Sequence, residues 1–164
     1  MGLLRTAVAG DLAAILILNE ADLPYLSPLS APALERLATI AAYFRVAEVD
    51  GRLAGFLLAL APEADHDSEN FLWFKQRYAR FLYIDRVVVA AHERRAGIAS
   101  QLYTDLEAPA RLSDVSVVAC EINLRPPNPD SLAFHDRHGF VEVGTKMTDN
   151  GKKTLSMRIK ELSR

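Results

Sequence analysis

The segment VVVAAHERRAGIASQLY, residues 87–103, contains the transition on which the fold depends. Its valines end an apolar run over 81–90, which is typical of a strand buried on both faces. Apolar residues then recur four apart from Ile98 to Leu106, as on one face of a helix. A second apolar run follows at 115–122, so this order predicts two parallel strands joined by a right-handed crossover helix.

Hairpin and helix signals flank this unit on both sides. Asp50 and Gly51 separate two apolar runs within 44–62, which predicts a hairpin with a two-residue turn. Asn128 before Pro129 predicts the start of a short helix, because asparagine caps helices and proline fits their first turn. Two closing strands around the turn signal TDNG complete a single domain, residues 1–164, with a mixed α/β sheet.

The remaining expectations concern the first half of the chain and one proline. We expect an edge strand at 3–8, a helix after Asp11 and another helix that begins near Ser30. The segment 63–80 is long enough to be an insertion over a site. Pro109 should kink or end the crossover helix, because proline removes a helical hydrogen bond.

Composition excludes several classes of partner. The net charge of −2 gives the chain no general attraction to nucleic acid or to an anionic membrane. Apolar runs stay well below the roughly 20 residues that a membrane-spanning helix needs. Cys120 is the one cysteine, so an intrachain disulfide is impossible, and we expect a cytoplasmic protein.

The loop before the crossover helix has the features of an anion site. Arg94, Arg95 and Gly97 precede a helix start, where backbone N–H groups lack partners and carry partial positive charge. Glycine allows an anion to approach that backbone, and arginines add donors. The alternative is a turn glycine with two solvated arginines. The loop lacks the Lys-Ser/Thr of a P-loop and the glycines of a dinucleotide fingerprint.

Two motifs in order resemble the signatures of the GNAT superfamily of N-acetyltransferases. RRAGIA (94–99) fits the family's pyrophosphate loop, R/Q-x-x-G-x-G/A. NPDSLAFHDRHGF (128–140) resembles the second signature, N-x-x-A/S-x-x-L/F-Y-x-x-x-G-F. The resemblance covers nearly the whole chain. It implies a mostly antiparallel twisted sheet, whose central parallel pair splays at the cofactor site, with helices on both faces.

The resemblance also implies acetyl-CoA as co-substrate and a primary amine as acceptor, with no metal. The cofactor would contact the backbone of the strand over 81–90, the loop that follows this strand and the helix that begins near Asn128. These residues are Val87, Val88, Val89, Arg94, Arg95, Ala96, Gly97, Ile98, Ala99, Ser100, Asn128, Ser131, Phe134 and His135. Asn128 would contact the donor or serve as a helix cap. The amine would attack the acetyl group directly, and the Val88 N–H would bind the oxyanion of the tetrahedral intermediate.

Three residues are candidates for proton transfer. His135 stands where the family usually places a tyrosine, so it would protonate the thiolate, hydrogen-bond the sulfur, or do neither. Asp85 is the first candidate for the base, because a carboxylate in a buried strand needs a partner or a function. Alternation places Arg86 on the opposite face, so those two should not pair, although a salt bridge to another element is an alternative. Glu121, on the next parallel strand, is the second candidate.

The acceptor site is the least determined part of this prediction. Trp73, Phe74 and Tyr78 are candidates for an aromatic lid over the acceptor, but a dimer surface or core packing would use the same residues. Cations nearby favour an acceptor that carries a carboxylate. The predicted acceptor is a small or amino-acid-like amine. The alternatives are a protein N-terminus or lysine, a non-catalytic acyl-CoA sensor, and a nucleotide-binding protein; a homodimer is one option for assembly.

Overall fold

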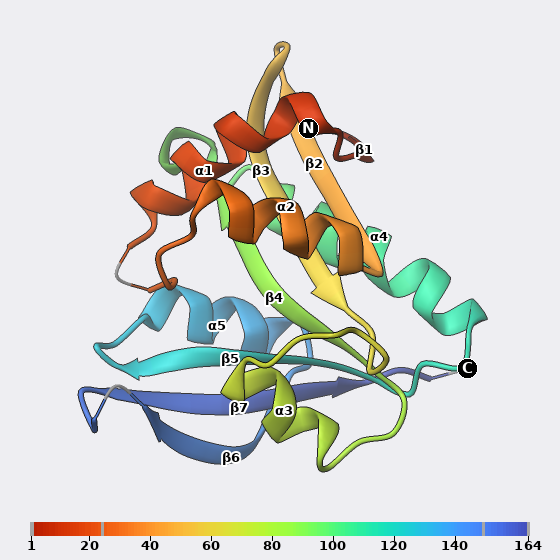
Figure 1. Ribbon diagram of the computed structural model, residues 1–164, viewed down its shortest axis with the longest axis vertical. Coiled ribbons are helices and arrows are strands. Elements are labelled where there is room, and N and C mark those ends of the chain that lie inside the picture. The colour runs from red at the N-terminus through yellow and green to blue at the C-terminus, as the bar shows by residue number, and fades with distance from the viewer. Residues whose placement is uncertain (1, 24, 149, 164) are drawn as a thin grey trace.

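The computed structural model describes residues 2–23, 25–148 and 150–163. Seven strands form one sheet in the order β1-β2-β3-β4-β5-β7-β6 (Figure 1). The strands are β1 (Leu3–Thr6), β2 (Tyr43–Val49), β3 (Arg52–Leu60), β4 (Phe81–Val89), β5 (Val117–Arg125), β6 (Val141–Thr148) and β7 (Lys153–Glu161). The β4–β5 pair is parallel and the other pairs are antiparallel, which confirms the predicted fold class.

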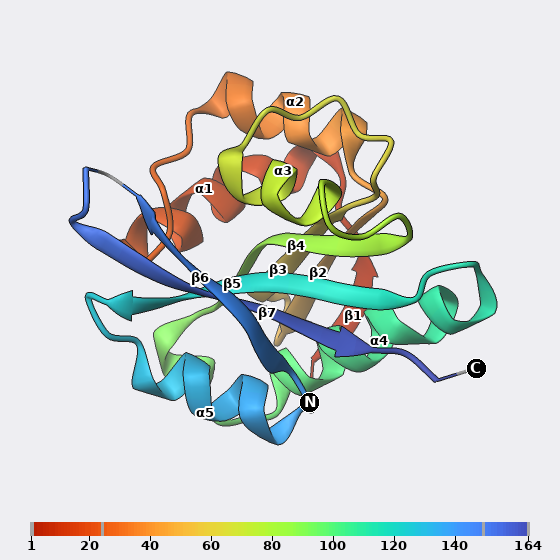
Figure 2. The same cartoon turned by 90° about the horizontal axis from the view of Figure 1, so that it is seen from below.

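Helices cover both faces of the sheet. They are α1 (Leu12–Ala21), α2 (Ala31–Ile40), α3 (Glu69–Lys75), α4 (Ile98–Leu112) and α5 (Pro129–Arg137), with single 3₁₀ turns at Ala9–Asp11 and Ala91–Glu93. Figure 2 shows α1, α2 and α3 on one face and α4 and α5 on the other. Each face has its own apolar core, which explains why β3, β4 and β5 are apolar on both sides.

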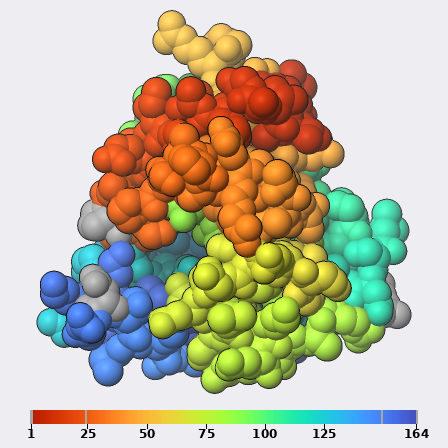
Figure 3. Space-filling model, viewed as in Figure 1, coloured from red at the N-terminus to blue at the C-terminus, as the bar shows by residue number. Residues whose placement is uncertain are grey.

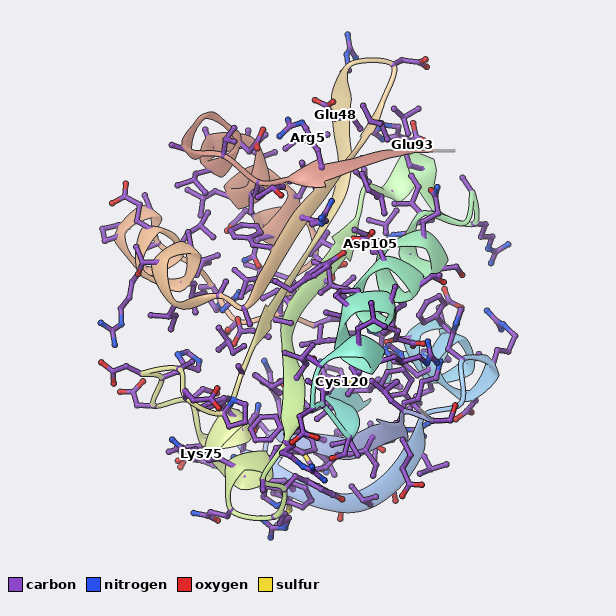
Figure 4. The ribbon with its side chains drawn as sticks, turned by 90° about the vertical axis from the view of Figure 1, so that its right-hand side faces the viewer. Arg5, Glu48, Lys75, Glu93, Asp105 and Cys120 are labelled. Carbon is purple, nitrogen blue, oxygen red and sulfur yellow. The ribbon has the colours of Figure 1, made fainter. Side chains whose placement is uncertain are left out.

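Local signals in the sequence form the elements that they predict. Asp50 and Gly51 have φ of 52° and 76°, the left-handed pair that a tight hairpin turn requires. Ser30 caps α2, because its hydroxyl accepts the Ala33 N–H at 3.2 Å. Asp11 precedes α1 as expected, but its carboxylate binds Arg5 instead of the helix amides. Arg5 also reaches Glu48 at 3.0 Å and so ties β1 to β2 (Figure 4).

One expectation about helices is corrected, and one helix was not predicted. The prediction that Pro109 kinks or ends the crossover helix is wrong on the end, because α4 continues through Pro109 to Leu112. The proline has no N–H and removes one helical hydrogen bond, and the packing of the apolar face of α4 against the core outweighs this cost. The 63–80 segment contains a helix, α3, which Ser68 caps and which buries Phe71 and Phe74 in the core. Seven residues give too little periodicity to identify such a helix in advance.

The parallel pair β4–β5 is joined over a short distance. Its ladder pairs Phe81, Leu82 and Tyr83 with residues 117–119, and both strands continue beyond it. The ribbons then diverge toward the α5 side of the molecule (Figure 1). The β5-facing edge of β4 past Tyr83 is therefore outside the ladder, and this divergence positions the site.

Candidate active site

The loop between β4 and α4 forms an anion cradle. Gly97 precedes α4 with φ of 85°, a left-handed conformation that glycine adopts at little cost, and Arg95 has φ of 67°. The first helical bond runs from Gln101 N–H to Gly97 O at 3.0 Å. The amides between them therefore have no acceptor within the helix, and they carry the partial positive charge of its N-terminus.

Arg94 is turned away from this cradle. Its Nη2 lies 3.0 Å from Asp22 Oδ1 at the end of α1, and its Nε donates to Val89 O at 3.3 Å. Arg95 is exposed and lies closer to the cradle in the chain. The arginine that is free to reach a phosphate is therefore Arg95, while Arg94 fastens the loop to α1.

The strand edge that faces the divergence belongs to Val87 and Val89. The carbonyl of Val88 faces β3, because it lies 2.7 Å from the position that a Cβ on Gly55 would occupy. In an extended strand the N–H and C=O of one residue point to the same side, so the Val88 N–H faces β3 as well. The prediction that the Val88 N–H binds the oxyanion is therefore wrong. The backbone N–H and C=O groups on the open side of β4 belong to Val87 and Val89.

These backbone groups fit acetyl-CoA. An open strand edge can hydrogen-bond an extended arm as an added strand would. It leads directly to the amides at the start of α4, which suit a pyrophosphate. Asn128 caps α5, because its Oδ1 accepts the Ser131 N–H at 3.4 Å, so its cap role is filled within the protein.

A bulge in β4 brings Asp85 and Arg86 to the same face. β3 pairs Leu58 with Arg86 and Ala59 with Ile84, so Asp85 is the extra residue. Arg86 Nε donates to Asp85 Oδ2 at 3.0 Å. The prediction that these neighbours cannot pair is wrong, because it assumed unbroken alternation along the strand.

Arg86 is a buried anchor that the sequence reasoning did not select. Its Nη1 donates to Asn19 Oδ1 and to Ser27 O, both at 2.9 Å, and its Nη2 donates to the Ser27 hydroxyl at 3.0 Å. Arg86 therefore holds the α1–α2 connection against β4. It also neutralises Asp85, whose side chain is 8% exposed.

Glu121 extends from β5 into the same region. Its Oε1 accepts hydrogen bonds from the Tyr83 hydroxyl at 2.8 Å and from Asn70 Nδ2 at 3.2 Å. Its Oε2 is buried and has no hydrogen-bond partner among the residues that the structure describes. Burial raises the pKa of Glu121 to about 7, although the bond from Tyr83 opposes the rise. An oriented carboxylate with one committed oxygen can accept a proton near neutral pH.

His66 lies beside Asp85 in the loop before α3. Its Nε2 is 3.4 Å from Asp85 Oδ1, but the angles do not make a hydrogen bond. Within the described part of the chain this buried nitrogen has no hydrogen-bond partner. Figure 3 shows a hollow over this region, bordered by the α2, α3 and β6–β7 segments, with green and teal atoms of β4 and β5 at its floor. The bulge, Glu121 and His66 thus line one polar site.

His135 lies on the other face of the sheet and is fully engaged. Its Nδ1 is 2.7 Å from Ser131 O, so Nδ1 carries the proton, and its Nε2 accepts from the Tyr103 hydroxyl at 2.7 Å. Burial lowers the pKa of His135 to about 4. Donation of a proton to a leaving group would require one of these bonds to break.

The aromatic segment 70–78 is largely occupied by packing. Phe74 is completely buried, and Tyr78 packs against the same core. Trp73 lies against Gly144 of β6, where an added Cβ would be 2.8 Å from the indole. Of the three predicted roles, core packing is the one that Phe74 fills.

The cations of this segment are also engaged. The guanidinium of Arg77 stacks on Trp73 at 3.6 Å, Arg80 pairs with Asp114 at 2.8 Å, and Lys75 lies over Phe71. They therefore give little support to an acceptor carboxylate. Within 2–23, 25–148 and 150–163, no group of three His, Cys, Asp or Glu side chains could hold a metal ion. No helix among these residues is long and apolar enough to cross a membrane.

Several residues of the site carried no usable sequence signal. His66 and Asn70 come from an irregular loop and a short helix, and Lys146 comes from the edge strand β6. Their positions depend on contacts across the sheet. Arg86 had a signal, because the argument that flagged a carboxylate in a buried strand applies equally to its guanidinium.

Comparisons with known proteins agree with this geometry. The model of the acetyltransferase (GNAT) family matches residues 14–140. No curated protein matches the sequence significantly. Ard1 from Thermoplasma volcanium is 16% identical, with a TM-score of 0.81 over 99% of both chains.

Two further solved structures are similar along nearly the whole chain. Naa20 from Chaetomium thermophilum, in complex with a bisubstrate analogue, is 22% identical, with a TM-score of 0.76 over 98% of this chain and 86% of that chain. A ribosomal-protein-alanine N-acetyltransferase from Brucella melitensis is 26% identical, with a TM-score of 0.72 over 98% and 99%. At 22% identity, the likeness to Naa20 shows a shared fold alone.

Proposed function

The chain belongs to the acetyltransferase (GNAT) family, and we propose that it transfers the acetyl group of acetyl-CoA to the primary amine of a small or amino-acid-like acceptor. The observation that carries this proposal is the position of Glu121. Its buried, unpartnered Oε2 belongs to the strand that diverges from the open edge of β4. An acyl donor along that edge and an amine at Oε2 would meet at the divergence.

In this proposal the backbone binds the donor. The amides from Arg95 to Ser100 bind the pyrophosphate, with Arg95 as an additional donor. The backbone of Val87 and Val89 holds the extended arm, and the Val87 N–H replaces Val88 as the donor to the developing oxyanion. Acetyl-CoA supplies the activated acetyl group when it is bound.

Glu121 is the proposed general base. An alkyl ammonium has a pKa of about 10.4 and must lose a proton before it attacks. A carboxylate that titrates near 7 holds that proton more readily than an ordinary glutamate, and Oε2 is free to receive it. Asp85 is then the partner of the buried Arg86, and His135 supports the packing of α4 against α5.

A second candidate is acetylation of a protein N-terminus. The observation in its favour is the 26% identity to a ribosomal-protein-alanine N-acetyltransferase over almost the entire chain. The chemistry at Glu121 would be the same, because an N-terminal amine also needs to lose a proton. The difference lies in the acceptor, so the two candidates are separated by the assay panel.

The test is a thiol-release assay with acetyl-CoA over a panel of amines. The panel contains small alkyl amines, amino-acid amides and short peptides with free or blocked N-termini. Turnover with small amines supports the proposal, whereas turnover with peptides alone supports the second candidate. Tight binding of CoA by calorimetry, without turnover of any amine, would overturn both in favour of a sensor, and tight binding of ATP without CoA would overturn the donor.

A further inference from the structure

Asn70 connects the site to a lysine on the opposite edge of the sheet. Its Nδ2 donates to Glu121 Oε1 at 3.2 Å, and its Oδ1 accepts from Lys146 Nζ at 3.0 Å. Lys146 comes from β6, while Asn70 comes from α3 and Glu121 from β5. Three elements thus meet in one chain of hydrogen bonds.

The chemistry of the lysine fixes the orientation of the amide. A lysine ammonium has donors and no acceptor, so the oxygen of Asn70 must face Lys146. The nitrogen of Asn70 must then face the carboxylate. Without Lys146 the amide loses this constraint, and a turned amide would place its oxygen, which accepts and repels a carboxylate, where Nδ2 now donates to Glu121.

This orientation decides which oxygen of Glu121 is free. The Tyr83 hydroxyl and the Asn70 amide both bind Oε1, and Oε2 is buried without a partner in residues 2–23, 25–148 and 150–163. A buried acceptor without a donor is costly, so a ligand N–H is the natural partner. We propose that Lys146 is a positioning residue, which acts through Asn70 to hold Glu121 with Oε2 free for the acceptor amine.

The inference rests on the proposed role of Glu121 and names a residue that acts on it from outside the site. Lys146 also pairs with Glu69 at 3.1 Å, but the Glu69 side chain is 79% exposed, so that ion pair is weak. The other titratable groups near Glu121 are Tyr83 and Asp85 on β4 and Cys120 on β5, with His66 beyond Asp85. None of them contacts Asn70 by a hydrogen bond given for the described residues.

The test is an NMR titration of the whole protein with isotope-labelled glutamate. The signal of Glu121 is identified by its loss in Glu121→Gln. Asn70→Ala and Lys146→Met should each raise the titration midpoint by about half a pH unit or more. The first variant removes a hydrogen bond that favours the charged carboxylate, and the second removes the ammonium that orients the Asn70 amide to make that bond. Lys146→Arg, which keeps the donors, should restore most of the wild-type midpoint.

Two controls make the result specific. Glu69→Gln removes the exposed ion pair and leaves the Lys146–Asn70 bond, so it should leave the midpoint unchanged. The double variant of Asn70→Ala with Lys146→Met should shift no further than Asn70→Ala alone, because the lysine acts through the amide. Amide spectra of each variant report whether it is folded, and Lys146→Ala replaces Lys146→Met if the latter is not.

Three results would overturn the inference. They are an unchanged midpoint in the folded Lys146 variants, an unchanged midpoint in Asn70→Ala, and a double variant that shifts by the sum of the single variants. In the last case Lys146 would act on Glu121 directly. The titration needs neither acetyl-CoA nor an amine, so its failure is distinct from a failure of the amine panel.

Discussion

The two faces of the sheet differ in how their buried polar groups are satisfied. On the α4–α5 face, His135 uses both ring nitrogens, and Glu107 is bound by Arg111 and Lys160. On the α1–α3 face, His66 Nε2 and Glu121 Oε2 are buried, and no described residue makes a hydrogen bond to either atom. A buried polar atom without a partner costs free energy, so it persists where a ligand can satisfy it. The presence or absence of partners for buried polar atoms, more than residue type, therefore separates the α4–α5 face from the face that carries the proposed base.

The largest expected effect comes from removing the proposed base. Glu121→Gln should lower kcat/KM by about 100- to 10,000-fold in the thiol-release assay, because general base catalysis contributes that much. Glu161→Gln, an exposed carboxylate at the end of β7, is the matched control and should leave kcat/KM unchanged. Wild-type turnover in a folded Glu121→Gln variant would show that the buried carboxylate without a partner is not needed for the reaction. The contrast between the two faces would then have no functional meaning.

Asp85→Asn should act mainly on stability. The variant leaves the Arg86 guanidinium buried without its anionic partner, and breaking such a pair costs about 3 kcal/mol. Denaturant unfolding measures the change, and kcat/KM should fall less than in Glu121→Gln. If Asp85→Asn is as stable as the wild type but loses its turnover, Asp85 is the base and Glu121 is not.

His135→Phe tests the supporting face. The change leaves the Tyr103 hydroxyl and the Ser131 carbonyl without their partner, which should lower the free energy of unfolding by about 2 kcal/mol. The pH profile of kcat should keep its shape, because in the proposed mechanism both ring nitrogens of His135 stay bound and take no part in proton transfer. Loss of the basic limb of that profile at unchanged stability would instead make His135 the general acid.

The smallest expected effect is a difference in how stability depends on pH. The pKa of His135 falls from 6.5 to about 4 on folding, so its contribution is present above 6.5 and is lost as pH falls toward 4. The pKa of Glu121 rises from 4.5 to about 7, so its contribution is present below 4.5 and is lost as pH rises toward 7. The two dependences oppose each other in the wild type.

Single variants should expose each dependence. As pH falls from 7 to 5, the free energy of unfolding of Glu121→Gln should fall by about 1–2 kcal/mol more than that of the wild type. The reason is that protonation of Glu121 no longer offsets the destabilising effect of His135. The free energy of unfolding of His135→Phe should instead rise over the same interval, relative to the wild type. Denaturant unfolding at several pH values measures both, and parallel curves for the two variants would contradict the assignment of these shifts.

The fold was predictable because its signals are local. The hairpin at Asp50, the cap at Asn128 and the strand–helix–strand unit each depend on a few adjacent residues. Pro109 misled the prediction of a helix end, because α4 continues past the one hydrogen bond that the proline removes. Packing against the core, which the sequence does not display, outweighed that local cost.

The site was predictable in part. The helix-start signal and the resemblance pointed to the loop at Gly97, the cost of burying a carboxylate in a strand selected Asp85, and position on the next parallel strand selected Glu121. The structure brings these residues to the divergence of β4 and β5. The pairing of Asp85 with Arg86 depends on a bulge that leaves no pattern in β4. The chain from Lys146 through Asn70 joins residues 76 positions apart, and such contacts become visible only after the sheet has formed.

The short ladder between β4 and β5 has a consequence for the lifetime of the protein. Three residue pairs join the β1–β4 half of the sheet to the β5–β7 half, so the two halves share only a short ladder. A ligand bound along the open edge of β4 would bridge these two halves of the sheet. At a hundredfold excess over its Kd, such a ligand adds about 2.7 kcal/mol to the free energy of unfolding. We therefore expect the abundance of the protein to follow the supply of its acyl donor.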